Sequence, residues 1–274
     1  MSTTAHAPLL RPLDRAPRVT FARVTRAEGT KLTSVRSSWL IGLLTIALSA
    51  AAGAAIAATE MTDPAAALAG GVGTSIRTIA PAVVVGEMFI SVLAVLFVTQ
   101  EFATGQKRVT YAAVPKRLPV LAAKTIVAAV VALILSVVSS VAAWATSSAV
   151  LSRSGLRTSL FDPAVLQSIG ASAAWLVLLT VFSVMIATLL RNSAASIALV
   201  LGVLLVLPIA VRVITGSSDF EWSSLLLTYS ETTMNQLITG TEPAADLGRD
   251  LVVTAAWLLV PMAAAAWATV RRDV

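Results

Sequence analysis

The sequence of 274 residues contains no cysteine and a single histidine, His6. Without cysteine the chain forms no disulfide and offers no thiolate, either as a nucleophile or as a metal ligand. The one histidine lies in an N-terminal segment that also contains proline and arginine, so serine–histidine catalysis and histidine-based metalloprotease chemistry are excluded as well. We therefore expect no enzyme activity and no metal site in this chain.

Sequence motifs of nucleotide and calcium binding are also missing. No G-x-x-x-x-G-K-[ST] phosphate loop, EF-hand, H-E-x-x-H or G-x-S-x-G pattern occurs. We expect no cofactor to be bound by this chain, and it has no phosphate loop with which to bind ATP on its own.

Charge is scarce. Charged residues make up 12% of the chain, hydrophobic residues make up 57%, and the mean hydropathy is +0.86. Repeated long apolar runs at this composition predict a membrane protein with several spans. We expect the formal net charge of +6 to orient the chain in a membrane, and we predict no nucleic-acid partner because no soluble basic domain is present.

The N-terminal region divides into two parts. Residues 1–17 contain three prolines and predict a disordered cytoplasmic tail. Residues 18–38 predict an amphipathic helix that lies on the membrane surface, with basic side chains directed to lipid headgroups. A solvated basic linker is the alternative, because Gly29 weakens the helix. The apolar positions with roughly helical spacing in this segment are Phe21, Val24, Leu32 and Val35.

Residues 39–274 predict an all-α membrane domain of six transmembrane helices. Each apolar run supplies the ~20 residues needed to cross ~30 Å of hydrocarbon. Small residues within the runs indicate close contact between helices, either inside the bundle or in a dimer. The spans are expected at about 39–59, 81–99, 120–150, 167–190, 193–214 and 251–270, and the small residues include Gly42, Gly53, Gly170 and Gly202.

The distribution of lysine and arginine indicates the orientation of the spans. With a cytoplasmic N-terminus, 15 of the 20 basic residues fall on the cytoplasmic side. Seven precede the first span, five lie between Thr99 and Lys124, one is Arg191 and two are near the C-terminus. Because cytoplasmic loops are enriched in lysine and arginine, we predict that both termini are cytoplasmic.

Two features are predicted on the opposite side. The connection from Thr215 to Asp250 is long and acidic, and its apolar positions predict one or two short extracellular helices, with a solvated loop as the alternative. Glu87 lies within the second predicted span, and helical spacing groups it with Ser91 and Ala94 on a face directed into the bundle. A buried acid makes Glu87 a candidate for a translocation path, with a structural role as the alternative.

The stretch "TQEFATGQKRVTYAAVPKRLPVLAAK", from Thr99 to Lys124, collects five basic residues and Glu101 between two apolar spans. It resembles the first cytoplasmic loop of bacterial ABC type-2 exporter permeases, in which an acid, a glycine, a P-x-R and a final lysine occur in this order. "RAEGTKLTSVRSSWL", from Arg26 to Leu40, is similar to the segment that leads into their first span, especially in actinobacterial members. "YSETTMNQLITG" is more weakly similar to the segment before their last span.

The resemblance implies a membrane-spanning exporter permease of the bacterial plasma membrane. Such a chain pairs with a second permease chain and with separate ATP-binding subunits, which hold ATP and magnesium. In the family, the N-terminal helix and the first cytoplasmic loop contact the ATPase. The implied coupling residues are Glu101, Gly105, Lys107, Arg108, Pro115, Arg117 and Lys124 in the loop, and Arg26, Glu28, Lys31, Arg36 and Trp39 in the interfacial helix.

Two other classes stay open from the sequence. An ion-coupled secondary carrier needs no ATPase and is expected to depend on Glu87. A non-transporting membrane scaffold or regulatory subunit is expected to assemble with partners without carrying a substrate.

Overall fold

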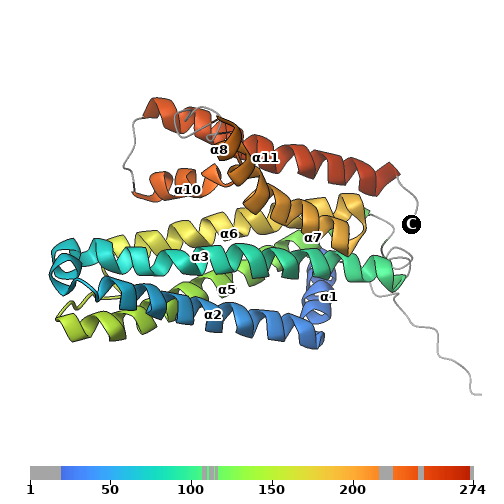
Figure 1. Cartoon of the computed structure of the whole chain (residues 1–274). Coiled ribbons are helices and arrows are strands. Elements are labelled where there is room, and N and C mark those ends of the chain that lie inside the picture. Colours follow the sequence, from blue (N-terminus) through green and yellow to red (C-terminus); the bar gives the residue numbers. More distant parts are fainter. Residues whose placement is uncertain are drawn as a thin grey trace, which may run out of the picture.

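The structure, a computed structural model, describes residues 20–106, 110, 114, 117–215, 225–239 and 244–271. Within these ranges every regular element is a helix, and six helices are long and apolar enough to cross a membrane (Figure 1). The predicted all-α class and the number of spans are confirmed at this level, as expected for a multi-pass membrane protein. The predicted tail, residues 1–17, lies outside the described residues.

The helices follow one another along the chain and run back and forth along one bundle (Figure 1). They are α1 (Phe21–Ser34), α2 (Arg36–Glu60), α3 (Pro64–Ala103), α5 (Arg117–Leu151), the 3₁₀ turn η1 (Ser152–Ser154), α6 (Pro163–Leu190), α7 (Ser193–Leu201), the π-helical turn η2 (Gly202–Val206), α8 (Leu207–Thr215), α10 (Tyr229–Thr239) and α11 (Ala244–Arg271).

The segment predicted as one interfacial helix, residues 18–38, is divided at Val35. This residue has extended backbone angles (φ −90°, ψ 121°), so α1 ends before it and α2 begins at Arg36. Trp39 therefore belongs to the first long helix instead of the interfacial one. Its indole N–H donates a hydrogen bond to the carbonyl oxygen of Thr33 at 2.8 Å, which fixes the angle between the two helices.

The second long helix is much longer than the span predicted from Pro81 to Thr99. α3 includes Pro81 in its interior, and a break at Gly71 (φ 52°, ψ −127°) marks the junction with its first two turns. Glycine is suited to this left-handed backbone conformation because it has no Cβ. Ile79 lies before Pro81 and is completely buried in one cluster with Val165 of α6, so tertiary packing keeps this part helical despite the proline.

Close contacts between backbones hold the first half of the bundle together. α2 packs along α5 and α3, and both of these pack along α6. At Gly53 a Cβ atom would lie 2.7 Å from the carbonyl oxygen of Ala143 in α5, so only glycine fits there. One turn away, the Thr146 hydroxyl donates to the carbonyl oxygen of Ala50 at 2.7 Å. These contacts confirm that Gly53 serves close packing within the chain.

The fifth predicted span is helical but changes its geometry midway. α7 passes into the π-helical turn η2, and α8 begins one residue before Pro208. A proline in the first turn of a helix needs no backbone N–H, and π-turns commonly accompany such bends. Few side chains of this span and of α11 are buried, so both lie at the periphery of the bundle.

The connection before the last span contains a helix, α10, as predicted. α10 packs on α6 and α11. The hydroxyl of Thr254 donates to the hydroxyl of Ser230 at 2.9 Å, and the Trp257 indole N–H donates to the carbonyl oxygen of Leu225 at the same distance. The first bond attaches α10 to α11, and the second attaches the residues just before α10.

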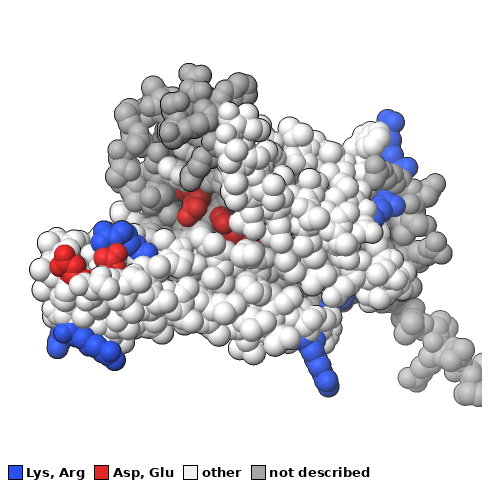
Figure 2. Space-filling model, in the orientation of Figure 1, with Lys and Arg blue, Asp and Glu red and all other residues white. Residues whose placement is uncertain are grey.

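The described ends of the chain lie at the same end of the bundle. α1, the start of α2, the end of α3 and the end of α11 all lie there (Figure 1). Figure 2 shows charged side chains towards the two ends of the molecule, and the surface between them is uncharged except for acidic patches part of the way along. An uncharged band of this kind is expected where side chains face lipid.

Candidate functional site

One face of α1 is buried against the bundle, and it contains an acidic residue. Val24, Glu28 and Leu32 follow one another at intervals of four residues, so they lie on one side of the helix, and all three are buried. Glu28 is 1% exposed. The two apolar residues therefore direct the Glu28 carboxylate into the bundle, towards the ends of α3 and α5.

Glu28 belongs to a cluster of two carboxylates and two ammonium groups. Lys31 Nζ lies 2.6 Å from Glu28 Oε1 and 2.6 Å from Glu101 Oε1. Lys124 Nζ lies 2.6 Å from Glu28 Oε2 and 3.2 Å from Glu101 Oε2. Each charge thus faces two opposite charges, and the cluster formed by Glu28, Lys31, Glu101 and Lys124 is electrically neutral. We refer to it as the ion-pair cluster.

Burial makes the geometry of this cluster important. Glu101 and Lys124 are each 4% exposed, and removing such groups from water is costly unless every charge is compensated. Lys124 Nζ also lies 4.0 Å from the centre of the Phe97 ring, in the position of a cation–π contact. Burial lowers the pKa of the Lys31 ammonium, but hydrogen bonds to Glu101 and Glu28 hold it above its ordinary value. The Lys31 ammonium is therefore charged at neutral pH.

The ion-pair cluster joins both ends of one connection to α1. Glu101 lies in the last turn of α3, and Lys124 lies two turns into α5, on the other side of residues 104–116. Lys31 also donates a hydrogen bond to the hydroxyl of Thr110 within this connection, at 3.3 Å. Gly105 has the positive φ (69°) expected of a glycine that shapes the turn after α3. The connection is thus held at its start, its middle and its end.

The other predicted coupling residues occupy different places. Arg117 begins α5 and donates a hydrogen bond to the carbonyl oxygen of Thr269 in α11 at 3.3 Å. Arg26 and Arg36 are exposed. Three further residues lie outside the described residues: Lys107, Arg108 and Pro115. Glu101 and Lys124 are buried against α1, so they act on a partner through the position of α1 and of residues 104–116. The predicted contact of the coupling residues with a partner stays a prediction.

Glu87 lies on the same helix as Glu101 but about 21 Å further along it, at 1.5 Å per residue. It is 7% exposed, and Ser91 and Ala94 are buried beside it, which confirms the predicted face. Its Oε1 accepts a hydrogen bond from the indole N–H of Trp175 at 2.7 Å. Among the described residues, Glu231 of α10 is the charged group that acts on it, and it repels the Glu87 carboxylate.

Sequence reasoning named all four members of the ion-pair cluster as coupling residues, but it missed their pairing, and it missed Trp175. The burial of Glu28 was not predicted either, although its spacing of four from both Val24 and Leu32 places it on the apolar face. The pairing of Glu28 with Lys124, and that of Glu87 with Trp175, links residues far apart in the chain. No spacing within one helix indicates such contacts, so they come from the fold alone.

In the part of the chain that the structure describes, no group of three histidine, cysteine, aspartate or glutamate side chains is placed to hold a metal ion. No protein-family model matches the sequence, and no curated protein matches it either. The assignment of function therefore depends on the residues and their geometry.

Proposed function

We propose that the chain is the membrane-spanning permease subunit of an ATP-driven exporter, acting with a second permease chain and a separate ATP-binding subunit. The ion-pair cluster is the observation that carries this proposal. The resemblance of the stretches from Arg26 to Leu40 and from Thr99 to Lys124 to type-2 exporter permeases supports it independently. Both stretches contribute two charged members to the cluster, so the segments that carry the resemblance also contact each other.

The physical argument concerns rigidity. A device that passes motion from an ATPase to membrane helices needs an element that moves as one piece between two states. The connection between α3 and α5 is attached to α1 through buried charges at both of its ends. A force applied to α1 or to the connection is therefore transmitted to α3 and α5 together. On this proposal the end of the bundle that carries α1 is cytoplasmic, in the bacterial plasma membrane.

The test uses the chain together with the P-loop ATPase that co-purifies with it, reconstituted as a complex in liposomes. Reversing the charge of Lys107 and Arg108 is expected to lower coupled ATP hydrolysis about ten-fold, which corresponds to ~1.4 kcal/mol. The matched control is Arg77→Glu, an exposed basic residue that pairs with Glu60 at 3.2 Å at the opposite end of the bundle, and it is expected to leave hydrolysis unchanged. Unaltered assembly and hydrolysis in the Lys107/Arg108 variant contradict the proposed coupling role.

Glu87 favours a second candidate, an ion-coupled carrier, because a buried carboxylate with a neutral hydrogen-bond donor can bind or release a proton. Flux by the purified chain in liposomes under a proton or sodium gradient, lost in Glu87→Gln, supports the carrier. Flux that appears only with the ATPase and ATP supports the exporter.

A further inference from the structure

An apolar groove opens beside the ion-pair cluster, where α1 meets α2. It has a volume of about 310 Å³, and its walls come from the end of α1, the first turns of α2 and the facing turns of α3 and α5. Leu43 of α2 and Ile134 of α5 line the groove, and each side chain is more than half exposed, so the groove is open to the side of the bundle. Gly42 contributes a wall without a side chain, and a Cβ there would lie 3.3 Å from Leu135.

A polar hollow adjoins the groove at one end. It has a volume of about 100 Å³, and polar groups of Lys31, Ser34, Gln100 and Glu101 line it. The two hollows share Leu32 and Ser38 as walls, so an apolar space passes into a polar one at the junction of α1 and α2.

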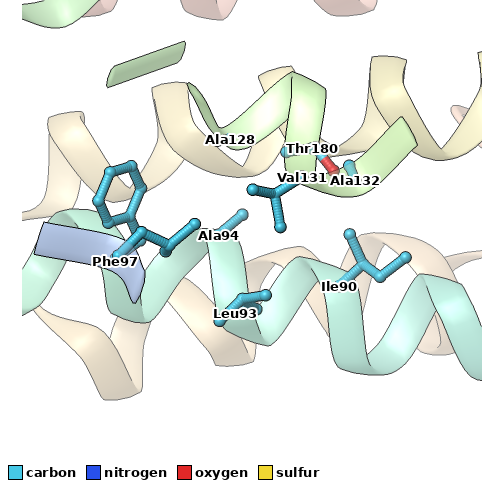
Figure 3. A pocket seen from close by; sticks show the side chains of 9 residues that line it. Ile90, Leu93, Ala94, Phe97, Ala128, Val131, Ala132 and Thr180 are labelled. Carbon is cyan, nitrogen blue, oxygen red and sulfur yellow. The ribbon is translucent and has the colours of Figure 1, made fainter. Parts of the chain in front are cut away.

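Among the described residues, the space behind the groove is narrow. Behind Leu32 lies a third hollow of about 10 Å³, shown in Figure 3 between apolar side chains of α3 and α5. This volume is at the lower limit for one water molecule. The hydroxyl of Thr180, the polar side chain there, already donates to the carbonyl oxygen of Leu176 at 2.7 Å. The space is therefore dry, and the groove and the polar hollow form a surface site.

The shape and charge of this surface site fit an amphiphile. The groove has room for about ten groups the size of a water molecule or a methylene, at about 30 Å³ each. Glu101 lines the polar hollow and Glu28 belongs to the adjoining ion-pair cluster, and lysines compensate the negative charge of both. Arg36 directly follows Val35, a wall of the polar hollow, and it is exposed and positive, so a negative head group is favoured at the polar end.

We propose that this surface site binds one phospholipid, with an acyl chain in the groove, its ester region over the polar hollow and its phosphate at Arg36. A lipid held here covers apolar side chains of α2 and α5 and supports the end of α1 beside the ion-pair cluster. Binding to the folded chain then stabilises the attachment of α1 by mass action. The proposal rests on the membrane location of the chain and is independent of ATP-driven transport.

The experiment is native mass spectrometry of the purified full-length chain, titrated with phosphatidylglycerol and with phosphatidylcholine of the same acyl chains. The unaltered chain is expected to retain one phospholipid and to prefer phosphatidylglycerol. Leu43→Trp and Ile134→Trp, which narrow the groove from opposite walls, are each expected to weaken retention at least ten-fold. Arg36→Gln is expected to abolish the preference for phosphatidylglycerol while phosphatidylcholine still binds.

Matched controls place the same residue beside the groove. Leu44→Trp and Leu133→Trp alter exposed leucines of α2 and α5 that do not line the groove, and retention is expected to be unchanged. The proposal is overturned if the groove variants retain lipid as well as their controls do. It is also overturned if removal of residues 1–19 increases lipid binding, or if the groove variants dissociate a dimer, because the groove is then occupied by the chain itself or by a second copy. Neither lipid result depends on the ATPase, so failure here leaves the proposed function open to its own test.

Discussion

Glu101 and Glu87 are the same residue type on the same helix, and both side chains are almost completely buried, yet their surroundings differ in kind. Glu101 lies between two ammonium groups and shares them with Glu28. Glu87 receives one hydrogen bond from a neutral indole and is repelled by Glu231. Burial alone therefore does not define the role of a carboxylate in this bundle.

The difference separates a fixed attachment from a site that responds to its surroundings. A carboxylate with two compensating cations keeps its charge and holds helices together, and removing one partner leaves an uncompensated buried charge. A carboxylate beside another carboxylate is destabilised as an anion, so its neutral form is favoured. On the proposed function, the first arrangement suits the end of the bundle that contacts the ATPase, and the second suits a place where a proton or a polar substrate group is recognised.

The largest effect is expected from Lys124→Met, which removes a cation from the ion-pair cluster and leaves Lys31 to compensate two acids. We expect the free energy of unfolding to fall by about 3–5 kcal/mol. The thermal unfolding of the purified chain in detergent micelles measures the change.

A double variant controls for loss of packing. Glu101→Gln combined with Lys124→Met leaves one acid and one cation, Glu28 and Lys31, and is expected to recover part of the lost stability. If the double variant is less stable than Lys124→Met by as much as Glu101→Gln alone costs, the two effects are additive and the groups do not act as one cluster.

Trp175→Phe is expected to have the next largest effect, at the other site. Trp175 is completely buried, and its loss leaves Glu87 Oε1 without its hydrogen-bond donor, at a cost of about 1–3 kcal/mol. Thermal unfolding is again the measurement. In a Glu87→Met background, which has no acceptor, the same substitution is expected to cost less, and an equal cost in both backgrounds means that the hydrogen bond contributes nothing.

Glu87→Gln sharpens the comparison directly. The Gln side-chain carbonyl still accepts the hydrogen bond from Trp175, and the repulsion by Glu231 is removed. We expect a gain in stability of less than about 1 kcal/mol. The corresponding change at the cluster, Glu101→Gln, is expected to destabilise the chain. The contrast between the two sites fails if both substitutions change stability in the same direction.

Much of this arrangement can be predicted from the sequence, for identifiable reasons. The apolar runs predicted six long helices because membrane spans need a certain length of apolar residues. The spacing of Glu87, Ser91 and Ala94 predicted a buried face because helical periodicity is local. α3 was predicted too short, because Pro81 suggests a boundary and only contacts with α6 show that the helix continues.

The composition of the ion-pair cluster could be predicted only in part. Glu101 and Lys124 were expected to act together, but as exposed residues. Their burial depends on α1 lying across the ends of α3 and α5, and α1 is separated from Glu101 by the whole of α2 and α3. Charged residues are seldom buried, and a compensating charge that lies far away in the sequence is visible only in the folded chain.

The smallest effect, and the last test of the comparison, concerns pH. Burial raises the pKa of the Glu231 carboxyl above its ordinary value of 4.5. The folded chain therefore binds this proton more tightly than the unfolded chain does. The contribution of Glu231 to stability is complete below that ordinary pKa and is lost as the pH rises through the raised pKa of the folded state.

Glu231→Gln has no such proton, so its thermal stability relative to the unaltered chain is expected to increase between about pH 5 and about pH 8. If the difference in stability between Glu231→Gln and the unaltered chain stays constant with pH, Glu231 is charged in the folded state throughout this range. Glu87 is then the one carboxylate that still distinguishes this site from the ion-pair cluster.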